Sequence, residues 1–187
     1  MKPKSKVLII AGSDSSGGAG IQADIKTVTA LGSYAMTAVT AVTCQNTKGV
    51  QAIIPISTKI LQKQIKMVLD DIGANAVKIG MLHNTQIIKC IYKILKKYNL
   101  KNIVLDPVMI AKGGTKLVNN NSIKYLKKLL IPLCSIITPN IPEAEVLTGY
   151  SISNKKDMIK AAQKILTMGA KNVLLKGGHL KNKMIFD

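Results

Sequence analysis

Short apolar segments alternate with longer amphipathic segments along this chain. The short segments are runs of mostly β-branched and aliphatic residues, which is typical of strands buried on both faces of a sheet. They comprise residues 7–11, 76–79, 103–105, 136–138 and 173–175. The stretch 34–57 is rich in Thr, Val and Ile without a helical period, and it predicts at least two further strands.

Between these runs, apolar residues recur every three or four positions with lysines on the opposite face. This pattern predicts helices over residues 61–72, 87–98, 123–133 and 158–166, and another over 21–31 after a glycine-rich loop. The side chains expected to cap the first four helices are Thr58, Asn84, Asn121 or Ser122, and Asn154. The alternation predicts an α/β fold, with one mostly parallel sheet, helices on both faces and a single domain over residues 1–187.

Length and composition narrow the class of protein. The chain has 187 residues, of which 47% are hydrophobic, enough for one sizeable core. No apolar run reaches the roughly 18 residues of a membrane span, and the run after the basic start is too short for a signal peptide. Three cysteines without a CxxC pair argue against a disulfide framework and a zinc site. We therefore expect a cytoplasmic protein without a membrane partner.

The formal net charge of +18 raises the question of a nucleic-acid partner. All 27 basic residues are lysine, whereas a dedicated nucleic-acid binder is expected to use some arginine for bidentate contacts. The aromatic content of 3% is too low for base-stacking platforms. Compositional drift or a solvated surface explains the charge better, although a basic surface still attracts an anionic nucleotide.

Small, charged and amide residues follow every predicted parallel strand, whereas the strand starts carry few of them. Ligands of open α/β sheets bind beyond the carboxyl ends of the strands, so this asymmetry predicts an active-site rim. The segments concerned are Gly12 to Gly20, Gly80-Met81, Asp106-Pro107-Val108, Pro139 to Glu143, and Lys176 to His179.

The loop Ser13 to Gly20 opens a predicted helix, where free backbone N–H groups form a natural anion site. Residues 18–23 also fit the G-x-G-x-x-G/A pattern of dinucleotide-binding folds. That pattern requires an acidic residue about 20 positions later, and none lies between Asp24 and Asp70. A GxxxxGK[ST] phosphate loop is also lacking. Both nucleotide-fold interpretations are therefore set aside. The alternative that this glycine-rich loop is only a tight turn without a ligand remains open.

Carboxylates are scarce in this sequence, with nine acidic residues in all. Asp106 ends one strand and Glu143 follows the next, so the pair can hold Mg²⁺ through water while a nucleotide supplies phosphate oxygens. Glu143 equally fits a helix N-terminus, where it would pair with the helix dipole. Lys176, between a strand and a Gly-Gly turn, can neutralise phosphate charge. His83 and His179 are expected to be hydrogen-bonding loop groups, and Cys44 is expected to lie in the core.

Six blocks in this order resemble the bacterial hydroxymethylpyrimidine/phosphomethylpyrimidine kinases of thiamine biosynthesis. They are residues 11–24 (AGSDSSGGAGIQAD), 40–47 (TAVTCQNT), 78–82 (KIGML), 104–109 (VLDPVM), 137–144 (ITPNIPEA) and 175–180 (LKGGHL). The resemblance implies a ribokinase-like fold and two successive phosphorylations that use ATP and Mg²⁺. The first acts on 4-amino-5-hydroxymethyl-2-methylpyrimidine and the second on its monophosphate.

The resemblance also implies a role for each matching residue. Gln45 is expected to hydrogen-bond the pyrimidine edge, since its amide offers both a donor and an acceptor. The rest of the expected pyrimidine site is Gly12, Asp24, Ala19, Met81 and Val108. Asn140 and Lys176 are expected at the ATP phosphates, with Asp106 and Glu143 at Mg²⁺. A homodimer is also implied.

Members of the family have a Gly-Thr-Gly-Cys segment whose backbone amides bind the moving phosphoryl group, and this sequence has none. The fold is therefore expected to lack its C-terminal elements, and no catalytic residue is assigned. Three hypotheses remain: a kinase of this family, an inactive remnant that at most binds the pyrimidine, and a related pyridoxal-type kinase. Gln45 and Met81 argue against the last.

Overall fold

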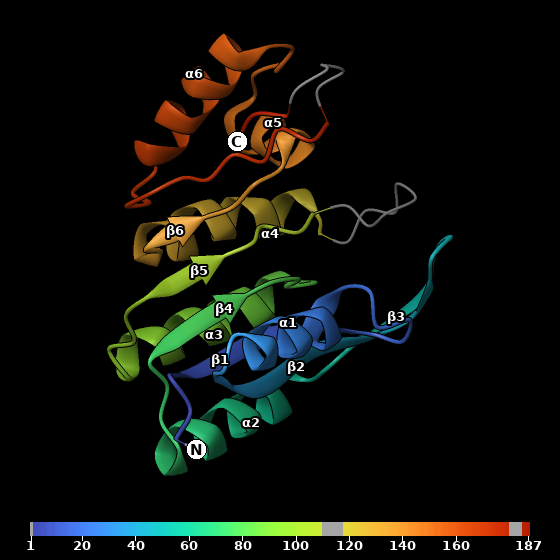
Figure 1. Ribbon diagram of the computed structural model, residues 1–187, viewed down its shortest axis with the longest axis vertical. Helices are drawn as coiled ribbons and strands as arrows, with labels where there is room; N and C mark the ends of the chain where they lie inside the picture. The colour runs from blue at the N-terminus through green and yellow to red at the C-terminus, as the bar shows by residue number, and fades with distance from the viewer. Residues whose placement is uncertain (1, 110–117, 180–184) are drawn as a thin grey trace.

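The computed structural model describes residues 2–109, 118–179 and 185–187. A sheet of six strands runs through the molecule in the order β3-β2-β1-β4-β5-β6 (Figure 1). The strands are β1 (Lys6–Asp14), β2 (Tyr34–Asn46), β3 (Gly49–Pro55), β4 (Ala76–Ile79), β5 (Ile103–Leu105) and β6 (Ile136–Ile137). Every neighbouring pair is parallel except β2 and β3, which form an antiparallel hairpin. The prediction of a mostly parallel sheet is confirmed, as are the two strands within residues 34–57.

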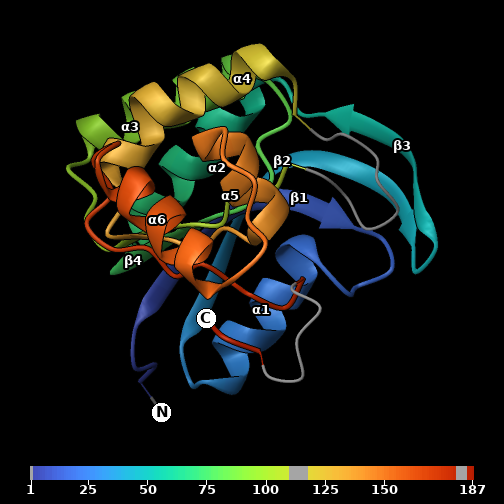
Figure 2. The same ribbon diagram turned by 90° about the horizontal axis from the view of Figure 1, so that it is seen from above.

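Helices cover both faces of this sheet (Figure 2). On one side lie α2 (Thr58–Asp71), α3 (Thr85–Lys97) and α4 (Asn120–Tyr125), and on the other lies α1 (Gly20–Ala30). The last two helices, α5 (Ile141–Thr148) and α6 (Lys155–Leu166), follow β6 at the far end of the molecule (Figure 1). Among the described residues, no helix is long and apolar enough to cross a membrane.

The main core lies between the sheet and the α2–α3 layer. Side chains that alternate along β1 and β4 point to this side and are fully buried: Leu8, Ile10, Val77 and Ile79. They pack against apolar faces of α2 and α3 that match the predicted periodicity: Leu61, Ile65, Ile87, Ile88 and Ile91. Because side chains alternate in a strand, Lys78 of β4 points to the opposite face, toward α1.

Two helix starts differ from their predictions. The α2 cap is Ser57, whose hydroxyl accepts from the Ile60 amide, and the α4 cap is Asn119, whose side chain accepts from the Ser122 amide. The predicted caps at Asn84 and Asn154 are confirmed. Ser57 directly precedes the predicted Thr58, and Asn119 lies two residues before the predicted Asn121, so the periodicity located each helix but not its first residue.

The predicted helix 123–133 is not one regular helix. After α4 the chain forms a π-helical turn over Leu126–Leu130 and a 3₁₀ turn over Ile131–Leu133. Pro132 lies in the last turn and has no backbone N–H to continue the α-helical pattern.

The predicted strand 173–175 lies beside β6, but it makes only isolated parallel bridges, at Val173 and at Lys176. The Leu174 amide donates to Ile137 O and the Lys176 amide donates to Pro139 O. Pro139 has no N–H to donate in return, so the ladder is interrupted there.

Candidate functional site

A cavity of about 310 Å³ opens at the carboxyl edge of the sheet. Its walls come from the ends of β1, β2, β4 and β5 and from the first turns of α1. The lining residues are Ala11, Gly12, Ser13, Asp14, Ala19, Gly20, Ala23, Asp24, Thr43, Gln45, Lys78, Gly80, Met81, Asp106 and Val108. This is the edge at which the strand-end chemistry predicted an active-site rim.

The six residues expected at the pyrimidine all line this cavity: Gly12, Ala19, Asp24, Gln45, Met81 and Val108. Asp106, expected at the metal, lies in the same wall. Asn140, Glu143 and Lys176 are outside the lining, at the ends of β6 and of the segment beside it. The structure therefore separates the expected pyrimidine residues from most of the expected nucleotide residues, with Asp106 at the boundary.

The loop after β1 differs from the free anion site that the sequence predicts. Asp14 is 3% exposed, and its carboxylate accepts hydrogen bonds from the Ala19 amide (2.8 Å) and the Gly18 amide (3.1 Å). It also accepts from the Ser16 amide and hydroxyl, both at 2.8 Å. Burial raises the pKa of Asp14, but these hydrogen bonds outweigh it and hold the pKa below its ordinary value. An internal carboxylate thus occupies the amides that an external anion would use.

Two glycines allow α1 to approach β1 closely. The β1–β2 register shifts between Ala11 and Ser13, so Gly12 lies at a bulge. Gly20 has φ +58°, and a Cβ there would collide with the Gly12 carbonyl oxygen. Only glycine fits this close contact without strain. The contact brings Asp24, one turn into α1, to the cavity wall.

Gln45 lies where β2 leaves the regular sheet. The β2–β3 register shifts between Cys44 and Gln45, and such bulges redirect side chains. The Gln45 backbone is tied to Ser15: its amide donates to Ser15 Oγ (2.9 Å), and that hydroxyl donates to Gln45 O (2.7 Å). Thr43 Oγ1 lies 3.2 Å from Gln45 Oε1. The amide is therefore held at the cavity with its donor group available, since no described residue accepts from it.

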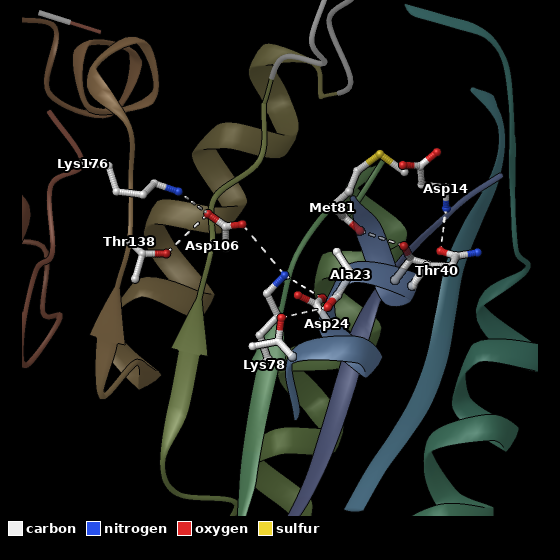
Figure 3. Close-up of polar contacts among 11 residues, drawn as sticks. Asp14, Ala23, Asp24, Thr40, Lys78, Met81, Asp106, Thr138 and Lys176 are labelled. Carbon is white, nitrogen blue, oxygen red and sulfur yellow. Dashed lines mark hydrogen bonds and ion pairs between the residues drawn. The ribbon is translucent and has the colours of Figure 1, made fainter. Parts of the chain in front are cut away.

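Met81 is positioned by a buried hydroxyl. Thr40 is fully buried in β2, and its Oγ1 donates to the Met81 carbonyl at 2.7 Å (Figure 3). The side chain of Met81 reaches back over Gly12, where a Cβ would lie 2.6 Å from Met81 Cε. Val108 packs against the cluster of apolar residues that contains Met81, and the two residues form an apolar part of the cavity wall.

A row of alternating charges runs from the cavity toward β6 (Figure 3). Lys78 Nζ lies 2.8 Å from Asp24 Oδ2 and 3.8 Å from Asp106 Oδ2. Lys176 Nζ donates to Asp106 Oδ1 at 3.0 Å, and Thr138 Oγ1 lies 3.3 Å from the same oxygen. The row joins the expected pyrimidine side to the expected phosphate side.

Glu143 and Asn140 form a reciprocal cap at the start of α5. Glu143 Oε2 accepts from the Asn140 amide and Asn140 Oδ1 accepts from the Glu143 amide, both at 2.9 Å. Glu143 is 4% exposed. Burial raises the pKa of Glu143 and the nearby Asp106 adds to the increase, while the Asn140 amide and Lys176 oppose it. The geometry agrees with the helix-terminal interpretation of Glu143, which the sequence left open.

Among the described residues, the carboxylates that contact Asn140 and Lys176 are those of Glu143 and Asp106. The described part of the chain has no cluster of three metal-ligating side chains. These residues fit Mg²⁺ that keeps most of its water and takes further oxygens from phosphate, because Mg²⁺ is often held by one or two carboxylates in this way. They do not fit a metal enclosed by protein ligands alone.

Lys78 is the main site residue that the motif reasoning did not assign. Its signal is present in the sequence: a lysine in the middle of the apolar run Ala76–Ile79. A buried charge of this kind requires a partner, but the sequence does not say which one. Asp14 and Thr43 are two further lining residues without an assigned role.

The predictions for Cys44 and His83 differ from the structure. Cys44 is exposed, because this part of the β2–β3 hairpin is covered on one face only. His83 Nδ1 is buried without a hydrogen-bond partner in the described structure, so the expected loop hydrogen bond is not formed there.

The fold is that of the ribokinase-like small-molecule kinases, which its structural neighbours represent. A family model described as phosphomethylpyrimidine kinase matches residues 14–187. The chain belongs to this family.

Sequence relatives support the same assignment. The hydroxymethylpyrimidine/phosphomethylpyrimidine kinase of Bacillus subtilis (strain 168) is 51% identical over 174 residues, covering 93% of this chain and 64% of that protein. The protein of the same name from Haemophilus influenzae is 49% identical, with 97% and 68% covered. The chain thus spans about two thirds of the length of these relatives.

Two solved structures show the same fold. The phosphomethylpyrimidine kinase from Clostridium difficile 630 is 54% identical with a TM-score of 0.89, covering 96% of this chain and 78% of that one. The pyridoxal kinase from Staphylococcus aureus, in complex with AMP-PCP and pyridoxal, is 36% identical with a TM-score of 0.88, covering 98% and 66%.

Proposed function

We propose that the cavity binds 4-amino-5-hydroxymethyl-2-methylpyrimidine, and that the protein to which this chain belongs phosphorylates its hydroxymethyl group and then its monophosphate with ATP. The observation that carries this proposal is the convergence of Gly12, Ala19, Asp24, Gln45, Met81 and Val108 on one cavity. Its volume, about 310 Å³, is at the small end for ligand pockets and suits a single heteroaromatic ring.

Within this cavity the pyrimidine would lie between Ala19 and the apolar wall of Met81 and Val108. The Gln45 amide can donate to a ring nitrogen and accept from the exocyclic amine at the same edge. Ser15 holds the Gln45 backbone in place before the ligand arrives, so little backbone entropy is lost on binding.

The nucleotide side would be the region around Asn140, Lys176 and Asp106. Lys176 would attract and orient the ATP phosphates, and Asp106 would help hold Mg²⁺ through water. When bound there, Mg²⁺ would neutralise phosphate charge. Glu143, already paired with Asn140, would act mainly by fixing the turn that presents Asn140.

Calorimetric titration of the purified chain with the hydroxymethylpyrimidine tests this proposal, with ATP turnover followed on the same sample. Saturable binding at one site supports the pyrimidine assignment, and turnover additionally supports the kinase reaction. Binding without turnover favours the alternative of a chain that only binds the pyrimidine. A folded chain that does not bind the pyrimidine contradicts the proposal. Sedimentation of the same sample checks the expected homodimer.

A pyridoxal-type kinase is the second candidate, and the likeness to the Staphylococcus aureus enzyme favours it. Competition between pyridoxal and the hydroxymethylpyrimidine for this chain distinguishes the two. Tighter binding of pyridoxal, unaffected by Gln45→Ala, would favour the second candidate.

A further inference from the structure

The charges in the cavity wall pose a problem for a substrate that carries phosphate. Three carboxylates contribute to the lining, those of Asp14, Asp24 and Asp106, and among the described lining residues Lys78 is the single cation. Asp14 keeps its charge and is solvated by hydrogen bonds from the loop, Asp24 pairs with Lys78, and Asp106 pairs with Lys78 and with Lys176 from outside the lining. A phosphate monoester entering this wall would meet an excess of negative charge.

The loop amides cannot solve this problem. In many phosphate sites backbone amides at a helix N-terminus take the anion, but here Gly18 and Ala19 donate to Asp14. A side-chain cation is therefore the remaining partner for the phosphate of a bound monoester, and Lys78 is the one that the described lining presents.

Lys78 has the geometry for this task. Its ammonium lies between Asp24 and Asp106 (Figure 3), at 2.8 Å and 3.8 Å. The Lys78 side chain is 23% exposed. Gly80 leaves room for it, since a Cβ at residue 80 would approach Lys78 Nζ to 3.1 Å. A lysine ammonium has three N–H donors and sits on a flexible side chain. It can therefore keep its ion pair with Asp24 and also donate to a phosphate oxygen.

We infer that Lys78 determines whether the cavity accepts the phosphorylated pyrimidine, whereas the neutral alcohol binds largely without it. This inference rests on the proposed function. In the absence of a phosphate, Lys78 offsets the repulsion between Asp24 and Asp106. When the monophosphate binds, Lys78 donates a charge-assisted hydrogen bond to a phosphate oxygen. Its positive charge also reduces the repulsion between the phosphate and the carboxylates of Asp24 and Asp106.

The test measures the Kd of the alcohol and of the monophosphate, without nucleotide, for the wild type and for Lys78→Met. The matched control is Lys63→Met, an exposed lysine of α2 on the opposite side of the sheet. We expect Lys78→Met to weaken monophosphate binding by about tenfold or more, the scale of one hydrogen bond to a charged group, and alcohol binding by less than about threefold. Lys63→Met should change neither Kd.

Two further variants keep the inference falsifiable if Lys78→Met folds poorly. Lys78→Arg keeps the charge and should retain most of the preference for the monophosphate. Asp106→Asn removes a competing carboxylate and should tighten monophosphate binding relative to the alcohol. Equal losses for both ligands in Lys78→Met, or no change in Asp106→Asn, would overturn the inference.

The two proposals fail in different ways. If the wild type binds neither ligand, the proposed function is wrong and the inference about Lys78 is wrong as well. If the wild type binds the alcohol but not the monophosphate, the proposed pyrimidine site stands and the role of Lys78 is wrong.

Discussion

The carboxylate of Asp14 accepts a 2.8 Å hydrogen bond from the backbone amide of Ala19, at the start of α1. Asp14 ends β1, so this bond ties the carboxyl end of a central strand to the first turn of the helix that follows. Ala19 lines the cavity, and its position therefore depends on a buried side chain that takes no part in the assigned ligand contacts. The glycine-rich loop is thus held from inside the protein.

Replacing Asp14 with alanine should destabilise the fold and loosen the cavity. The change leaves the amides of Ser16, Gly18 and Ala19 without their acceptor. Hydrogen bonds to a charged group are worth about 1.5–3 kcal/mol, so we expect a loss of about that size in the free energy of unfolding, measured by urea denaturation. Asp71→Ala, at the exposed end of α2, is the control and should stay within about 0.5 kcal/mol. A similar effect of both changes would contradict this role.

Stability should depend on pH with opposite signs for Asp14 and Glu143. The folded pKa of Asp14 lies below its ordinary value of 3.8, so ionised Asp14 stabilises the fold above that value and the contribution disappears as the pH falls through the folded pKa. The folded pKa of Glu143 is raised above 4.5, so the wild type loses stability as the pH rises through that value toward the folded pKa.

Denaturation of Asp14→Asn and Glu143→Gln across the acid range measures these signs. The stability advantage of the wild type over Asp14→Asn should grow with pH, and that over Glu143→Gln should shrink with pH. Parallel pH profiles for the wild type and both variants would show that neither carboxyl group titrates as the structure indicates.

Gln45→Ala should weaken binding of the hydroxymethylpyrimidine. The change removes the cavity-lining amide that offers a donor and an acceptor to the ring edge. We expect the Kd to rise about tenfold or more, the scale of one or two buried hydrogen bonds, with little effect on the melting temperature. Gln163→Ala, on the exposed face of α6, is the matched control. An unchanged Kd for Gln45→Ala would rule out the substrate assignment.

Gly20→Ala should be far more harmful than Gly49→Ala. At Gly20 a Cβ meets the Gly12 carbonyl in a backbone conformation with φ +58°, whereas at Gly49 nothing lies within 4 Å. Left-handed strain alone costs about 1 kcal/mol or more, and the collision with backbone adds to it. Thermal unfolding of the two variants should show a clear loss for Gly20→Ala only; equal melting temperatures would contradict the close α1–β1 contact.

The three thiols should react in the order of their exposure. Cys44 is exposed, Cys90 is half-buried and Cys134 is buried. Burial raises the pKa of Cys90, with Lys93 opposing it, and raises the pKa of Cys134 to about 12. Because the thiolate is the reactive form, mass spectrometry after brief alkylation should find Cys44 modified first and Cys134 only after unfolding. Early modification of Cys134 in the folded protein would contradict its burial.

Much of the fold follows from local patterns in the sequence. Short apolar runs mark β1, β4 and β5 because a strand covered on both faces needs apolar side chains on both, although Lys78 interrupts the run of β4. The helical periodicity of apolar residues located α2, α3 and α6 for a similar reason, because one apolar face of each helix must pack against the core. Local patterns were weaker at element ends: Ser57 rather than Thr58 caps α2, and Pro139 interrupts the pairing of residues 173–175 with β6.

The sequence by itself determined the fold class, the family and the small set of strand-end residues from which the site is built. The tertiary structure alone decided which of these residues interact. Lys78 meets Asp24 across 54 positions of sequence and Lys176 meets Asp106 across 70 positions. Asp14 takes the loop amides that an outside anion would otherwise use. Electrostatic partners depend on distances of a few ångströms. These distances are set by the packing of α1 on the sheet and by the pairing of residues 173–176 beside β6, which no local pattern encodes.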